Sequence, residues 1–79
     1  MNKEKKEALD ICKTLSKKCI DQECWKIAVD LCNVGFVIDT EGVIDKVSKK
    51  DNFILNTKNF HTKEINKLIV YLDKNRLFK

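Results

Sequence analysis

The feature that most constrains this 79-residue chain is the scarcity of turn-forming residues, because it contains no proline and only two glycines, Gly35 and Gly42. Collagen-like chains, flexible linkers and turn-rich β-sandwiches all depend on these two residue types. The length allows a single small domain, residues 1–79. With 43 % apolar and 35 % charged residues, the composition is that of a folded chain rather than a disordered tail.

Helical periodicity is clearest over residues 3–20. Ala8, Cys12, Leu15 and Cys19 recur at the spacing i, i+4, i+7 and i+11, while the lysines lie mainly elsewhere. This pattern predicts an amphipathic helix with one buried face.

The next helix is predicted over about 22–34 and is apolar around most of its circumference. A helix of this kind is typically buried, so we expect it to be central, with Trp25 and Phe36 in the core. Asn33 or Gly35 can supply the left-handed residue that ends it.

Two further helices are predicted, over about 40–49 and 60–74, and Leu77 and Phe78 are expected to fold back onto the last turn. The short apolar runs 36–38 and 53–55 leave open a two-stranded β pairing with each other. The predicted fold class is therefore mainly α, a compact bundle of about four helices with or without that short pairing.

All four cysteines lie between residues 12 and 32. An antiparallel hairpin that turns near Asp21 would place Cys12 beside Cys32 and Cys19 beside Cys24. Such neighbours can be buried thiols that act as small apolar side chains, a pair of disulfides, or a four-thiolate metal site. The spacings match neither zinc-finger pairs nor a CxxC redox motif.

No enzyme motif is present, and the single histidine, His61, lies far from the cysteines in sequence. We therefore expect no catalytic activity and no cofactor. Residues 39–45 resemble the middle of an EF-hand loop, but Val37 and Ser48 occupy the positions of its first and last ligands, so no calcium site is expected.

Nucleic-acid binding is the main alternative, because the net charge of +4 resides entirely in residues 40–79. The candidate phosphate contacts are six lysines between residues 46 and 67, namely Lys46, Lys49, Lys50, Lys58, Lys63 and Lys67. Residues 63–78, with Leu72 and Leu77, resemble the end of a winged-helix recognition helix, which implies a helix-turn-helix-like C-terminal half. The chain departs from that family because no wing follows Lys79, and residues 53–60 are too long for a tight turn.

Aromatic residues at the edges of the predicted elements are candidate protein contacts: Phe53, Phe60, Tyr71 and Phe78. The leading hypothesis is a small non-enzymatic interaction module that regulates or inhibits a larger macromolecular partner, as many phage- or plasmid-encoded proteins do. The alternatives are the nucleic-acid-binding protein and a cysteine-stapled or metal-bearing helical hairpin. Without a signal peptide or an apolar run of about 18 residues, the chain is expected to be cytoplasmic and not membrane-bound. The sequence leaves its oligomeric state open.

Overall fold

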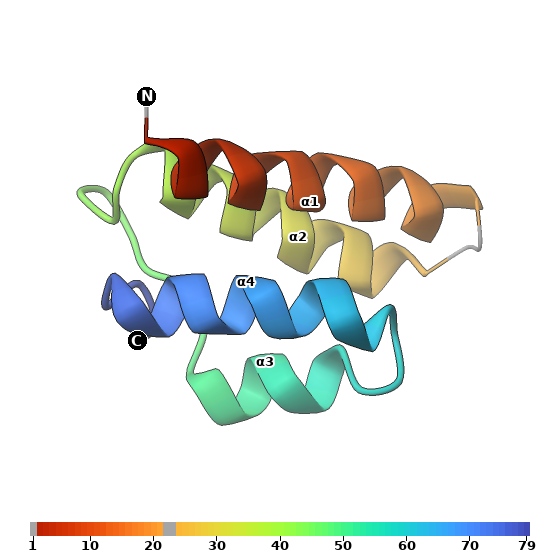
Figure 1. Ribbon diagram of the computed structural model, residues 1–79. Coiled ribbons are helices and arrows are strands. Elements are labelled where there is room, and N and C mark those ends of the chain that lie inside the picture. Colours follow the sequence, from red (N-terminus) through yellow and green to blue (C-terminus); the bar gives the residue numbers. More distant parts are fainter. Residues whose placement is uncertain (1, 22–23) are drawn as a thin grey trace.

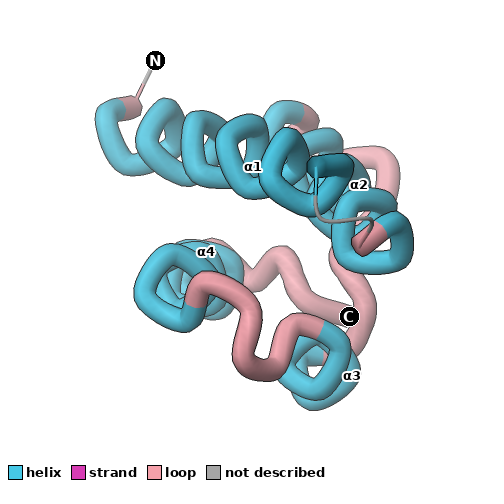
Figure 2. The backbone as a smooth tube through the Cα atoms, turned by 90° about the vertical axis from the view of Figure 1, so that its right-hand side faces the viewer, coloured by secondary structure: helices cyan, strands magenta, loops and turns pink. Residues whose placement is uncertain are grey.

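The computed structural model describes residues 2–21 and 24–79. The described residues form α1 (Lys3–Asp21), α2 (Trp25–Asp39), α3 (Lys50–Asn56) and α4 (Thr62–Lys74). Figure 1 shows α1 and α2 as an antiparallel hairpin that lies over a second hairpin of α3 and α4, and Figure 2 shows the same two layers from the side. The prediction of a mainly α bundle of about four helices is confirmed.

The hydrophobic core lies between these two layers. The predicted stripe of α1 is buried, as expected from its periodicity. The other buried apolar residues are Ala28, Leu31, Val34, Val37, Ile38, Val47, Phe53, Phe60, Ile65, Leu68, Leu72 and Leu77. Each of the two layers therefore contributes its inward face to one common core.

Helix α2 is longer than the helix predicted over about 22–34, and it continues through Gly35 to Asp39. Val37 and Ile38 are fully buried and prolong the inward face, which favours continued helix. At Gly35 a Cβ atom would lie 3.8 Å from the Cβ of Cys12, so this glycine sits where α2 packs on α1. The prediction that Asn33 or Gly35 ends the helix is wrong. Its predicted first residues, 22–23, lie outside the described residues.

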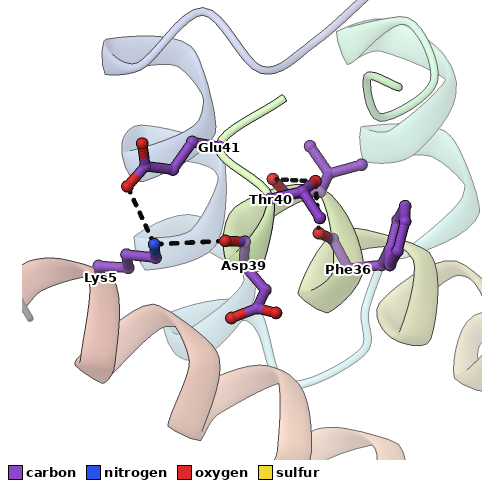
Figure 3. Close-up of polar contacts among 6 residues, drawn as sticks. Lys5, Phe36, Asp39, Thr40 and Glu41 are labelled. Carbon is purple, nitrogen blue, oxygen red and sulfur yellow. Dashed lines mark hydrogen bonds and ion pairs between the residues drawn. The ribbon is translucent and has the colours of Figure 1, made fainter. Parts of the chain in front are cut away.

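The C-terminal end of α2 is held by Thr40, which directly follows the helix, and by Lys5 of α1 (Figure 3). The Thr40 hydroxyl donates a hydrogen bond to the carbonyl oxygen of Phe36, at 2.9 Å. From α1, the Lys5 ammonium donates to the Asp39 carbonyl oxygen at 3.3 Å and pairs with the Glu41 carboxylate at 3.0 Å. A cation is favourable here because the last carbonyl groups of a helix carry partial negative charge.

Residues 40–49 do not form the predicted helix, and that prediction is wrong. Gly42 has φ +72°, and a Cβ atom there would lie 2.8 Å from a side-chain carbon of Leu77. The segment then extends beside the C-terminus, where the Val47 amide donates to the Leu77 carbonyl and the Lys79 amide donates to the Val47 carbonyl. This isolated parallel bridge between Val47 and Phe78 replaces the helix.

The proposed β pairing is not formed either, because residues 36–38 belong to α2 and residues 53–55 belong to α3. In α3, Phe53 is buried, and its carbonyl oxygen accepts a hydrogen bond from the Thr57 hydroxyl at 2.7 Å. The packing of Phe53 into the core from a short helix thus decides between the two conformations. After α4, the Leu77 amide donates to the Leu72 carbonyl at 2.9 Å, which confirms the expected fold-back.

Candidate functional site

An apolar stripe lies on the surface along α2. Trp25, Val29 and Phe36 expose 59 %, 68 % and 47 % of their surface, and Cys32 is exposed as well. We call Trp25, Val29, Cys32 and Phe36 the α2 stripe. Their spacing of i, i+4, i+7 and i+11 places them on one face of the helix. The expectation that Trp25 and Phe36 belong to the core is therefore wrong.

The stripe is exposed because α2 is packed on its other side. The inward residues Ala28, Leu31, Val34 and Ile38 have their own helical spacing and lie about half a turn away from the stripe. In Figure 2, α2 lies at one side of the upper layer, with α1 beside it and the layer of α3 and α4 below. The side of α2 that faces away from these helices is left open to solvent. The structure therefore uses only one of the two apolar faces of α2 for folding, and contiguous exposed apolar surface of this kind commonly marks an interaction site.

The aromatic residues singled out from the sequence are mostly folded inward. Phe53 and Phe60 are buried, so these two candidates lie in the core rather than at the surface. Phe78 is half-buried with its ring centroid 5.9 Å from that of Phe53. Tyr71 is half-buried between α1 and α4, where burial raises the pKa of its hydroxyl. Of the four, Tyr71 and Phe78 keep some accessible surface, and neither belongs to the α2 stripe.

The pKa values of the two cysteines of α1 are raised by burial and then by the cysteines near or in α2. Burial, and then proximity to Cys32, raises the pKa of Cys12 to about 12. Burial, and then proximity to Cys24, likewise raises the pKa of Cys19, whose carbonyl oxygen accepts a hydrogen bond from the Cys24 amide at 2.7 Å. All four are thiols in the structure. The Cys12 and Cys19 thiols therefore stay protonated near neutral pH and are poor nucleophiles.

Metal-binding chemistry has no support in the described part of the chain, where no three His, Cys, Asp or Glu side chains form a group that could hold a metal ion. In the segment that resembles an EF-hand loop, the Glu41 carboxylate is occupied by Lys5. His61 precedes α4, and its ring meets that of Phe60 edge-on with centroids 4.5 Å apart.

Three of the six candidate lysines for nucleic-acid binding have partners within the protein. Lys50 pairs with Asp73 at 3.2 Å, and Lys67 pairs with Glu7 at 3.8 Å. The Lys46 ammonium donates to the carbonyl oxygen of Arg76 at 3.1 Å. Half of the six candidate lysines therefore already contact groups within the protein.

The remaining three, Lys49, Lys58 and Lys63, are exposed. Lys49 precedes α3, whereas Lys58 and Lys63 flank the loop at the opposite end of that helix (Figure 1). The helix that resembles a recognition helix, α4, buries Ile65, Leu68 and Leu72.

No helix in the described ranges combines the length and hydropathy that crossing a bilayer requires. Comparison of the chain with family models, curated proteins and solved structures gives no match.

Proposed function

We propose that this protein is a non-enzymatic interaction module that binds a partner protein through the α2 stripe and thereby regulates or inhibits that partner. The observation that carries the proposal is the exposure of two large aromatic side chains, Trp25 and Phe36, on one helix face. Tryptophan is among the residues most enriched at the energetic centres of protein interfaces.

The dimensions of the stripe fit a contact with one secondary-structure element. From Trp25 to Phe36 the helix rises about 16 Å, close to three turns. Val29 and Cys32 fill the space between the two aromatic ends, so the apolar surface is continuous along the helix. A partner helix or strand laid along α2 would remove this surface from water, which is favourable by roughly 25 cal/mol for each Å² of apolar area buried.

The proposal is tested by separating binding from stability. The variant Val29→Glu with Phe36→Glu places two charges on the α2 stripe. The matched control, Val43→Glu with Ile44→Glu, places two charges on residues of the 40–49 loop that are 84 % and 71 % exposed. Both variants should keep the wild-type melting temperature within about 4 °C, since exposed substitutions usually change stability little.

Immobilised wild-type protein and the control variant should retain the same partner from an extract of the native host, and the stripe variant should lose it. Retention by all three would contradict the proposal, and so would equal loss from both variants. The nucleic-acid alternative is supported by the exposed Lys49, Lys58 and Lys63, and it predicts instead that a duplex binds with a steep dependence on salt.

A further inference from the structure

A second apolar surface lies between α1 and α4, on helices other than α2. The helix α1 packs far more extensively against α2 than against α4, and a groove of about 420 Å³ remains between α1 and α4. Its lining includes the apolar side chains of Ala8, Ile11, Val70 and Tyr71. Val70 exposes 65 % of its surface, so this groove is open to solvent.

The groove is long rather than compact. A second hollow of about 170 Å³ shares Ile11 with the first and continues between the same two helices to Lys18 and Glu64. The two hollows together follow α1 from Glu4 to Lys18, a rise of about 21 Å. This length matches a helix of about 14 residues better than a compact small molecule.

The two edges of the groove differ in charge. The α1 edge of the larger hollow carries Glu4 and Glu7, and its α4 edge carries Lys67 and Lys74. The smaller hollow adds Asp10 and Lys18 on α1 and Glu64 on α4, so over both hollows the α1 edge stays acidic and the α4 edge stays basic only on balance. Ion pairs cross the groove between Glu4 and Lys74 at 3.3 Å and between Glu7 and Lys67 at 3.8 Å. All four side chains are more than half exposed, and exposed pairs of this kind add little stability, so a partner can replace them at low cost.

We propose that the α1–α4 groove is a second docking site, and that its occupant is an amphipathic helix of a partner protein with basic residues along one flank of its apolar face and acidic residues along the other. The apolar face covers Ile11 and Val70. The basic flank lies against the acidic α1 edge, and the acidic flank lies against the lysines of α4. This is the helix-in-groove mode of recognition, with the charges fixing the direction of the bound helix.

The α2 stripe of a second copy is the competing occupant, but its charges fit less well. Lys26 and Asp30 are four residues apart and lie on the same flank of α2, so that helix does not offer one basic and one acidic flank. The groove site does not depend on the α2 stripe. Together the two surfaces would let the module contact two partners at once.

The test uses three synthetic 14-residue helical peptides with the same leucine and alanine face. One carries lysine on one flank and glutamate on the other, one carries lysine on both, and one carries glutamate on both. Fluorescence anisotropy at low salt should give the mixed peptide a dissociation constant about tenfold lower than either of the others, because each of them places like charges against one edge of the groove. A helix can enter a groove in either direction, so the mixed peptide can always match both edges.

Two variants localise the site. Val70→Glu should weaken the mixed peptide at least about tenfold, while the control change Val43→Glu, at an exposed valine of the 40–49 loop, should leave it unchanged. Lys67→Glu with Lys74→Glu makes both edges acidic and should shift the preference to the all-lysine peptide. Melting curves of each variant establish that the fold is retained.

Equal affinity for the three peptides would overturn the charge argument, and full binding by Val70→Glu would overturn the location. Sedimentation at increasing protein concentration tests whether the α2 stripe of a second copy occupies the groove, because the protein would then form a dimer. A dimer that Val70→Glu and Val29→Glu both abolish would assign the groove to the α2 of a second copy and overturn the proposed occupant. The two peptide results leave the role of the α2 stripe to be judged on its own variants, whereas such a dimer would assign the stripe to self-association.

Discussion

The two faces of α2 should respond oppositely to the same kind of truncation. Leu31 is fully buried in the core, whereas Val29, two residues away on the same helix, exposes 68 % of its surface. Leu31→Ala removes buried apolar atoms and leaves a cavity, which costs about 2–5 kcal/mol. Val29→Ala removes atoms that already face water and introduces a better helix former, so its effect should stay within about 0.5 kcal/mol.

These costs are large relative to the stability of so small a domain. At about 0.05–0.15 kcal/mol per residue, the whole chain has a free energy of unfolding of roughly 4–12 kcal/mol. Leu31→Ala should therefore lower the melting temperature by at least about 8 °C, and Val29→Ala should change it by less than about 4 °C.

The assay is urea unfolding followed by circular dichroism, with thermal melts as a second probe. Equal slopes of the free energy against urea would show that the variants differ in stability and not in the extent of unfolding. If both substitutions cost more than about 2 kcal/mol, α2 is buried on both faces and the reasoning fails. If neither costs more than about 1 kcal/mol, α2 is not packed on the core as described.

Three other predictions concern the turn, the thiols and the lysines. Gly42→Ala should cost about 1–2 kcal/mol in urea unfolding, because φ is +72° and the new Cβ meets a leucine side chain. Folding raises the pKa of Cys12 from 9.0 to about 12, so the stability that its protonated thiol contributes should be complete below pH 9 and decline as pH rises toward 12. At pH 8, a thiol reagent should modify the exposed Cys32 in seconds and the buried Cys12 only on unfolding. Lys49→Glu with Lys50→Glu should leave partner binding intact, and loss of a salt-dependent affinity for duplex DNA would instead favour the nucleic-acid alternative.

The parts of the fold that could be predicted are those set by local periodicity. The stripe of α1 and the inward stripe of α4 have one apolar face each, so their spacing identifies both the helix and its buried side. The return of Leu77 onto the last turn of α4 follows from the usual geometry of a helix end. Each of these features depends on residues that are close in sequence.

The errors have a different origin, because they depend on contacts between distant segments. The apolar spacing of residues 40–49 is compatible with a helix, but Gly42 and Val47 are instead fitted against the C-terminal residues. Phenylalanine is common in strands, yet Phe53 packs into the core from the short helix α3. The preference of an isolated segment is weak compared with such tertiary packing.

The candidate site was missed because α2 is apolar on both faces. Periodicity shows that Trp25, Val29, Cys32 and Phe36 share a face, but it does not show which face of an apolar helix the remaining elements will cover. The length of the chain is the one signal that could have helped. A domain of this size buries only about 60 % of the surface of its unfolded chain, so a helix with two apolar faces is expected to leave one of them exposed.

The most direct test of the account is the fluorescence of Trp25, the only tryptophan in the chain. In dilute wild-type protein, the account predicts emission at the long wavelength of a solvated indole, strong quenching by acrylamide, and no change in either on further dilution. A blue-shifted emission that acrylamide does not reach, at every concentration, would place Trp25 in the core and contradict the claim that α2 presents a free apolar face.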